Sequence, residues 1–212
     1  MNDRLRDNYE ALLLAYVAGA LDAAQSLIVA AHAALSVTAR SRIAQLEALG
    51  GTLLCQGCEP QGMSAGALDK VLAKLEGCCE DEHAQHCCHS FPDNIKLPRT
   101  LNRTIHDTIG TPQWQNYLPG FQVFDLPLEC PQSQVRFLKA EPGRQAPAHV
   151  HDGMEITLLL DGAYGDENGH YGCGDLIVMD QADGAHAPVA CREQGCICMV
   201  VSSKIGNTDL PS

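Results

Sequence analysis

Apolar residues recur at intervals of three and four through the first 76 residues, which is the spacing of amphipathic helices. Leucine, alanine and valine dominate this part of the chain, and Pro60 is its only proline. The pattern therefore predicts a helical N-terminal region with four helices. They are expected over about residues 8–20, from Asp22 to Leu35, over about residues 38–49, and from Ser64 to about residue 75.

Local signals at the helix ends sharpen this prediction. Asp22 is expected to cap the second helix, because its carboxylate can accept hydrogen bonds from the unpaired backbone N–H groups of the first turn. Gln25 stands three residues later, where its side chain can reach back to the cap. Ser64 is expected to cap the fourth helix. Gly50-Gly51 is expected to end the third, because glycine adopts the backbone conformation found just past helix C-termini.

The helical pattern stops at residue 77 and gives way to cysteine, histidine, acidic residues and proline. We interpret residues 77–99 as a linker. It carries seven side chains able to bind soft metals or to react with oxidants, namely Cys78, Cys79, His83, His86, Cys87, Cys88 and His89.

From residue 100 the pattern changes to short apolar or alternating runs separated by glycine, proline and aspartate. Such runs predict an antiparallel β-sandwich or barrel over residues 100–212. The expected fold is therefore α+β, with a four-helix domain over 1–76, the linker over 77–99 and the β domain over 100–212. The clearest strand predictions are Gln134–Lys139, Glu155–Leu160, Leu176–Met179 and Cys196–Ser202.

Charge narrows the range of functions. The chain has 26 acidic and 14 basic residues among 212, a formal net charge of −12. Direct nucleic-acid binding is not expected, because contacts to phosphates need a basic surface. An acidic chain is better suited to attracting a basic protein surface, or simply to staying soluble. There is no run of 18 uncharged apolar residues and no signal peptide, so we expect a cytoplasmic protein without membrane contact. Neither a glycine-rich phosphate loop nor a nucleophile elbow is present.

Eleven cysteines need another explanation than structural disulfides, because thiols stay reduced in the cytoplasm. Their number is odd and some are adjacent, as in Cys78-Cys79. Metal binding or redox chemistry fits this pattern better than a disulfide framework.

The most specific motif of the chain is Gly143-x5-His149-x-His151-x3-Glu155-x6-Gly162. On a strand, residues two apart share a face, so His149 and His151 are expected to point to the same side. The Asp152-Gly153 turn could then bring Glu155 beside them on a returning strand. Two imidazoles and a carboxylate suit Zn²⁺, Fe²⁺, Mn²⁺ or Cu²⁺. His186 is the leading candidate for a fourth ligand.

This spacing is similar to the first motif of the cupins, small β-barrels that hold a metal with two histidines, a glutamate and a later histidine. The second cupin motif is represented by Gly174-Asp175 and Gly184-Ala185-His186, without the usual proline and terminal asparagine. The resemblance implies a cupin domain with His149, His151, Glu155 and His186 as metal ligands.

A second resemblance covers nearly the whole chain. Residues 15–21 and 27–32, together with the stretch 158–163, Gly174-Asp175 and Asp180-Gln181, resemble the ChrR-type anti-sigma regulators. In that family a zinc-binding helical domain clamps an extracytoplasmic-function (ECF) sigma factor, and a cupin domain follows. The resemblance implies an anti-sigma factor, not an enzyme, with Zn²⁺ or another divalent metal in its cupin. It also implies a response to singlet oxygen or organic peroxide.

One departure from the family concerns its helical zinc site, a His-x3-Cys-x2-Cys run with an upstream histidine. His32 stands at the first position, but Ser36 and Ala39 replace the cysteines and Asp7 replaces the upstream histidine. A site of the family type cannot form without thiolates. Either the helical domain has lost its zinc, and His32 is packed or solvated, or a metal sits elsewhere. Cys55-x2-Cys58 with the linker residues His83, His86, Cys87 and Cys88 would be such a place.

Two other functions remain open from the sequence. A cupin metalloenzyme, such as an Fe²⁺-dependent dioxygenase or an isomerase, could use the same ligands if a coordination position stays open. A metal or redox buffer would rest on the linker's cysteines and histidines alone.

Overall fold

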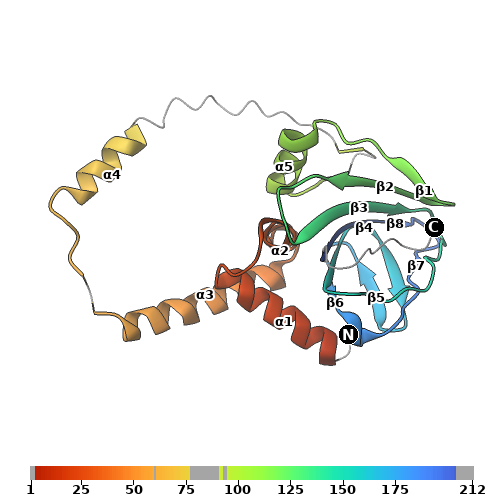
Figure 1. Ribbon diagram of the computed structural model, residues 1–212, viewed down its shortest axis with the longest axis horizontal. Coiled ribbons are helices and arrows are strands. Elements are labelled where there is room, and N and C mark those ends of the chain that lie inside the picture. Colours follow the sequence, from red (N-terminus) through yellow and green to blue (C-terminus); the bar gives the residue numbers. More distant parts are fainter. Residues whose placement is uncertain (1–2, 60, 77–90, 93–94, 204–212) are drawn as a thin grey trace.

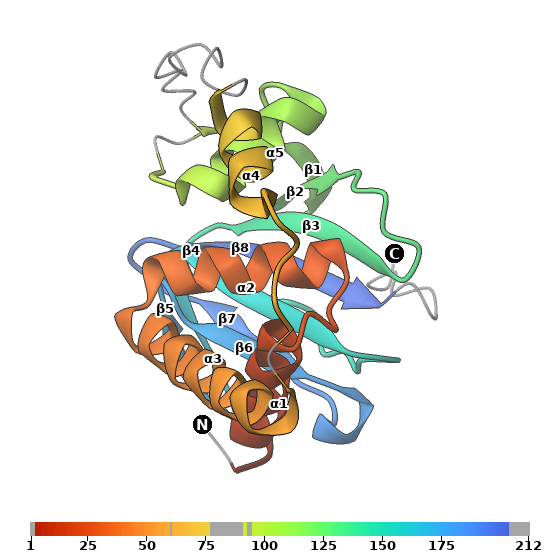
Figure 2. The ribbon, with the colours of Figure 1, turned by 90° about the vertical axis from the view of Figure 1, so that its left-hand side faces the viewer.

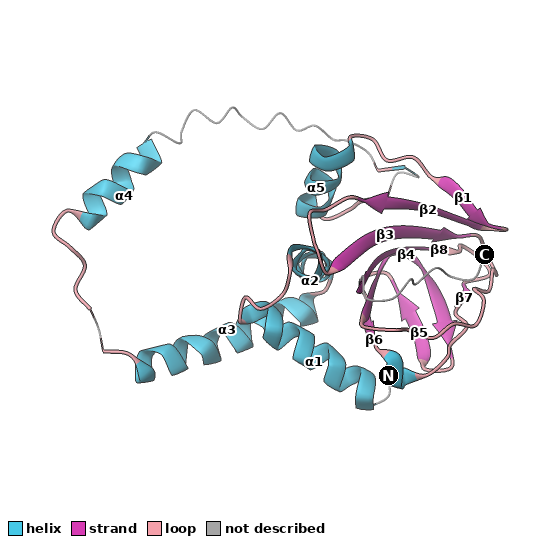
Figure 3. Ribbon diagram, viewed as in Figure 1, coloured by secondary structure: helices cyan, strands magenta, loops and turns pink. Residues whose placement is uncertain are grey.

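The computed structural model describes residues 3–59, 61–76, 91–92 and 95–203. Its helices come first and its strands follow, as the α+β prediction expected (Figure 3). No helix in these ranges is long and apolar enough to cross a membrane. The helices are α1 (Asp3–Val17), α2 (Ala23–Leu35), α3 (Val37–Gly57), α4 (Ala67–Glu76) and α5 (Arg99–Ile109).

All four predicted helices are present, but the predicted end of the third and the predicted cap of the fourth are wrong. α4 starts at Ala67, three residues after Ser64, and α1 starts earlier than predicted, at Asp3. α3 runs through Gly50-Gly51 to Gly57. Neither Gly50 nor Gly51 has the positive φ that a terminating glycine needs. A glycine inside a helix costs only about 1 kcal/mol relative to alanine, so it weakens a helix without ending it.

Helix α5 was missed, because the β domain was expected to start at residue 100. Leu101 and Ile105 are fully buried on one side of this helix, and Ile109 is packed against the same core. Their spacing of four residues after Pro98 is a helical signal that the sequence did contain.

The predicted cap of α2 is confirmed and has a second role. Gln25 N–H donates to Asp22 Oδ1 at 2.8 Å, and Asp22 N–H donates to Gln25 Oε1 at 3.3 Å. The other carboxylate oxygen of Asp22 accepts a hydrogen bond from Ser133 Oγ at 2.5 Å. Because Ser133 is the first residue of β3, the cap ties the helical region to the sheet.

The sheet is antiparallel throughout, with the order β1-β2-β3-β8-β4-β5, and both β6 and β7 pair with β4. The four predicted runs coincide with β3, the first half of β4, β6 and β8. The strands are β1 (Gln115–Leu118), β2 (Phe121–Leu126), β3 (Ser133–Ala140), β4 (Glu155–Asp166), β5 (Gly169–Gly172), β6 (Leu176–Met179), β7 (Val189–Ala190) and β8 (Cys196–Ser203), with a short 3₁₀ helix at Gln181–Asp183.

Alternate residues of the central strands serve two different cores. Phe137 of β3 and Met199 of β8 are fully buried against the helices. Leu138 and Cys198, their neighbours in sequence, belong to a second cluster inside the barrel. This alternation is the two-residue period of a strand.

The outer face of the sheet is covered by helices. α2 packs on β3, β4 and β8, α1 packs on β6, and α5 packs on β2 (Figures 1 and 2). Ile28 of α2 and Leu13 of α1 are fully buried in the same cluster as Phe137. Helices α1 to α3 and the β-barrel therefore share one continuous hydrophobic core.

Helix α4 and the end of α3 project away from this core (Figure 1). Large apolar side chains on both remain exposed. They are Leu49, Leu53 and Leu54 on α3, and Leu68, Val71 and Leu72 on α4.

Candidate metal centre

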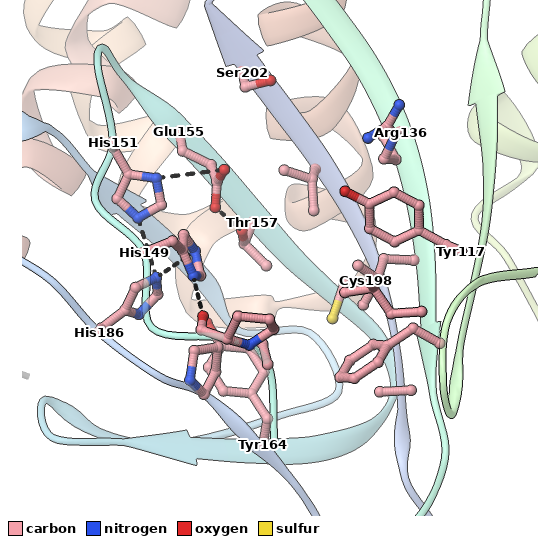
Figure 4. Close-up of a pocket in the computed structure, with 18 of the residues that line it drawn as sticks. Tyr117, Arg136, His149, His151, Glu155, Thr157, Tyr164, His186, Cys198 and Ser202 are labelled. Carbon is pink, nitrogen blue, oxygen red and sulfur yellow. Dashed lines mark hydrogen bonds and ion pairs between the residues drawn. The ribbon is translucent and has the colours of Figure 1, made fainter. Parts of the chain in front are cut away.

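Three histidines converge on one point at the wall of the barrel. The Nε2 atom of His186 lies 3.0 Å from Nε2 of His149 and 3.1 Å from Nε2 of His151 (Figure 4). One ligand atom from each of the three lies within 4.8 Å of the other two. His151 and His186 are buried, and His149 is half-buried. The structure thus brings together three of the four predicted ligands.

The backbone fixes two of these histidines directly opposite each other. His149 N–H donates to His186 C=O at 3.1 Å, and His186 N–H donates to His149 C=O at 3.0 Å. The sequence had predicted that the segment with His149 and His151 is a strand that pairs with the strand starting at Glu155. Instead it forms an isolated bridge with the segment that carries His186, so the second motif directly supports the first.

The outer ring nitrogens of these histidines are held by other groups. His149 Nδ1 lies 2.9 Å from Pro147 C=O, and His186 Nδ1 lies 2.9 Å from Asp166 Oδ2. A carbonyl can only accept, so Nδ1 of His149 carries the proton and Nε2 keeps its lone pair when the ring is neutral. Such partners orient histidines as metal ligands through Nε2.

Asp166 is a residue of this site that the sequence analysis missed. Its side chain is only 1% exposed and forms an ion pair with His186 when that ring is protonated. Its other oxygen, Oδ1, accepts from the backbone N–H of Asn168 and Gly169. The sequence signal was hidden because an aspartate two residues before Asn-Gly is well explained as part of a hairpin turn.

Glu155 lies beside His151 and not at the convergence point itself. Its Oε2 is 3.5 Å from Nδ1 of His151. Burial alone would raise the pKa of the Glu155 carboxyl, but the hydrogen bond to His151 and the nearby histidine charges outweigh burial and hold this pKa below its usual value. The side chain is therefore a carboxylate at neutral pH.

The pKa values of His149 and His151 are shifted in opposite directions. Burial lowers the pKa of His149, and the neighbouring His186 and His151 add to this effect. Burial also acts to lower the pKa of His151, but Glu155 and, more weakly, Asp183 and Asp180 leave it raised. His149 is thus neutral at pH 7, the form in which imidazole binds metal ions.

This donor set could hold a divalent transition metal. Neutral imidazole nitrogens and a carboxylate are the preferred ligands of Zn²⁺, Fe²⁺ and related ions. The three Nε2 atoms face one another, and their outer nitrogens are already hydrogen-bonded or next to a carboxylate. The residues present therefore fit a metal ion.

A cavity of about 370 Å³ lies next to the three histidines, inside the barrel (Figure 4). Its other walls come from the inward-facing residues of β1 to β4 and β8 and from the segment 146–152. Most of these side chains are apolar.

The proposed second metal site involves residues beyond those described. Cys55 and Cys58 are exposed free thiols at the end of α3. Their predicted partners His83, His86, Cys87 and Cys88 lie outside the described residues. Within the ranges that the structure describes, one group of three or more potential ligands lies within 4.8 Å, namely His149, His151 and His186.

The helical positions that replace the family's zinc ligands have other contacts. His32 is buried, with Nδ1 2.8 Å from Gly174 C=O and Nε2 3.0 Å from Tyr9 Oη. Ser36 caps α3, because its Oγ accepts from Ala39 N–H at 3.2 Å. Ala39 is fully buried, and Asp7 is exposed. These residues do not fit a zinc ion, and His32 is packed, one of the two roles that the sequence had left open for it.

Three comparisons with known proteins bear on this site. A family model described as the ChrR Cupin-like domain matches residues 103–205. The anti-sigma-E factor ChrR of Cereibacter sphaeroides is 34% identical over 193 residues, which are 91% of this chain and 87% of that protein. A solved structure of Rhodobacter sphaeroides SigE in complex with the anti-sigma ChrR matches with a TM-score of 0.71 at 33% identity. The match covers 91% of this chain and 96% of that one.

Proposed function

Because the chain belongs to the family of ChrR anti-sigma factors, we propose that it binds an ECF sigma factor and keeps it from RNA polymerase. The observation that carries this proposal is a set of exposed apolar residues on two helices that lie apart in Figure 1, the end of α3 and α4. Together we call these residues the α3–α4 surface. It consists of Leu49, Leu53, Leu54, Leu68, Val71 and Leu72, whose exposed fractions run from 46% to 66%.

An apolar surface of this kind is expected to bury itself against a partner. The net charge of −12 favours a basic partner, which a DNA-binding sigma factor would be. An inhibitor of RNA polymerase assembly works where the polymerase is, so we place the protein in the cytoplasm. Neither nucleic acid nor membrane is needed for this role.

The binding proposal is tested by mixing the full chain with an ECF sigma factor encoded beside it and measuring affinity by calorimetry. Leu53→Glu should weaken binding at least tenfold, because a charge would have to be buried in the interface. Leu14→Glu is the matched control, since Leu14 of α1 is equally exposed but lies outside the α3–α4 surface. Failure of the wild-type chain to bind any such sigma factor would overturn the proposal.

For the cupin we propose Zn²⁺ held by His149, His151 and His186, with Glu155 as the carboxylate ligand. The support is the convergence of three Nε2 atoms and the ionised carboxylate beside them. When bound, the ion would fix the segment of His186 against the segment of His149. Oxidative stress, by singlet oxygen or organic peroxide, is the signal we propose for this centre.

A route for such a signal runs through residues 180–186. Asp180 Oδ1 accepts from Ala182 N–H at 2.8 Å, and Asp183 Oδ2 accepts from Asp180 N–H at 2.7 Å. These two bonds cap the short 3₁₀ helix over 181–183 and hold Asp180 and Asp183 together. We propose that a displacement of His186, three residues further along the chain, would reach Asp183 through Gly184 and Ala185.

Helix α1 contacts this segment directly. Arg4 Nη2 lies 2.7 Å from Asp180 Oδ1, and Arg4 Nε lies 3.0 Å from Asp183 Oδ1. The next residue, Leu5, is 1% exposed and packs in the inner cluster with residues of β6. Further along α1, Glu10 Oε2 pairs with Arg42 of α3 at 2.7 Å. We infer that this chain of contacts links the metal centre to the helix that carries the α3–α4 surface.

The cavity beside the histidines is the observation that favours the alternative, a cupin metalloenzyme. An enzyme would consume O₂ or convert a small substrate when loaded with Fe²⁺. We propose a regulator instead, because the similarity to an anti-sigma factor extends over 91% of the chain. Steady O₂ consumption by the Fe²⁺-loaded protein would favour the enzyme.

A further inference from the structure

The cavity inside the barrel has no role in the contacts described so far. Its volume of about 370 Å³ is at the lower end of the range of small-molecule sites, which is roughly 300–1,000 Å³. The cavity opens to solvent, and open concave sites lined mainly by apolar side chains with a few polar groups are the usual form of small-molecule sites.

The cavity changes from polar to apolar along the strands that line it. At one end, Gln134 of β3 is paired with Ser202 of β8, which is also paired with Glu155 of β4. Towards the other end, Leu138 is paired with Cys198. Beyond them Ala140 and Cys196, with Phe121 nearby, complete an apolar end.

The histidine cluster lies near the polar end. Glu155, which belongs to that end by its register, is next to His151 (Figure 4). An ion held by the three histidines would offer a place for one anionic oxygen from outside the protein, because carboxylate oxygens are ligands of Zn²⁺ and related ions. Zinc with three protein ligands keeps an open fourth position, and in catalytic sites the ion sometimes takes five ligands.

We propose that the cavity binds a small amphiphile, with an anionic carboxylate head at the histidine cluster and an apolar body along Leu138 and Cys198. The inference rests on the proposed metal centre but not on the sigma factor. Polar groups at one end and apolar walls at the other fit such a molecule and no fully polar one.

Calorimetry on the Zn²⁺-loaded full chain tests this with octanoate as the probe. Acetate has the same head without the apolar body, and octanol has the body without the charged head. Octanoate should bind at least tenfold more tightly than either. Equal affinities for octanoate and acetate would overturn the proposal, and so would equal affinities for octanoate and octanol.

Variants locate the ligand. Leu138→Trp should abolish octanoate binding by filling the apolar end, whereas Leu138→Met, which conserves volume, should not. Val200→Phe tests the same wall from β8 if the tryptophan variant does not fold. In His149→Ala/His151→Ala, octanoate should bind no more tightly than octanol. Octanoate binding that survives both Leu138→Trp and Val200→Phe would place the ligand elsewhere and overturn the proposal.

Sigma-factor binding is measured on the same preparations. A chain that binds octanoate but no sigma factor would contradict the proposed function alone. A chain that binds a sigma factor but shows no preference for octanoate would contradict this inference alone.

Discussion

Arg4 in the first turn of α1 lies 3.0 Å from the buried carboxylate of Asp183, three residues before His186. The Asp183 side chain is 2% exposed, and its Oδ2 also accepts from Asn8 Nδ2 at 3.4 Å. The first residues of the chain are thus in direct contact with the segment that carries a metal ligand of the cupin.

Removing this contact should uncouple the two halves of the protein. Arg4→Ala leaves the buried Asp183 without its cationic partner, so the protein should lose thermal stability. If loss of zinc from the cupin is what releases the sigma factor, this release should be weaker in Arg4→Ala than in the wild type. Arg6→Ala is the control, because Arg6 pairs with the exposed Asp3 on the same helix. Release that is as complete in Arg4→Ala as in the wild type would exclude this route.

The metal content per chain should fall from one ion in the wild type to none in His149→Ala/His151→Ala. The physical reason is the loss of two of the three converging nitrogens. Elemental analysis of the purified protein measures this directly. Two ions that fall to one would instead show a second site, with Cys55, Cys58 and the linker as its candidates. An unchanged content in the double variant would contradict the cupin site.

Asp166→Asn should weaken zinc binding by roughly 10- to 100-fold without removing a ligand, as is typical when a partner of a metal-bound histidine is changed. Asp166 accepts from Nδ1 of His186, and an amide orients that ring less strongly than a carboxylate does. Competition with a chelator gives the affinity. Asp125→Asn, at an exposed carboxylate paired with Arg136, should leave it unchanged.

His32 should make stability depend on pH. Burial lowers its pKa, and the hydrogen bond to Gly174 and the charge of Asp175 only partly offset this. The unfolded chain therefore binds a proton on His32 more readily than the folded chain does. Stability should rise with pH through the window just below 6.5 and be lost as the pH falls below it. The slope of unfolding free energy against pH should be smaller in His32→Gln, and an identical slope would contradict this account.

The shared core predicts a single unfolding transition for α1 to α3 and the barrel. Ile28 of α2 is fully buried in this core, so Ile28→Ala should cost about 2–5 kcal/mol. Val37→Ala, at a residue that is 71% exposed, should change stability by less than about 0.5 kcal/mol. In both variants, the far-ultraviolet circular dichroism of the helices and the near-ultraviolet signal of the packed core should be lost at the same denaturant concentration. Separate transitions would show that the helices and the barrel fold independently.

Much of this architecture could be predicted from local patterns. Alternation along Gln134–Lys139 and Cys196–Ser202 identified β3 and β8, and Asp22 with Gln25 identified the start of α2. These features depend on neighbouring residues. The three cupin histidines were found because their spacing is similar to that of a known family.

Other features depend on residues far apart in the chain and were not predicted. Asp166 acts on His186 across 20 residues, and Arg4 contacts Asp183 across nearly the whole sequence. Gly50 and Gly51 were misread because the sequence does not show whether a glycine adopts a positive φ. The continuous core was not foreseen either, since nothing in a local pattern says which element an apolar helix face will cover.

The alternation along β3 and β8 places a constraint on how the chain can change during evolution. Phe137 and Met199 serve the helices, while Leu138 and Cys198, one residue along, serve the cavity. A one-residue insertion or deletion inside either strand would move every following side chain to the opposite face of the sheet. Residues that now pack against the helices would then face the cavity, and residues that now line the cavity would face the helices. Length changes in these strands should therefore be tolerated only in pairs of residues or absorbed by a bulge. Homologues are expected to differ in their loops instead.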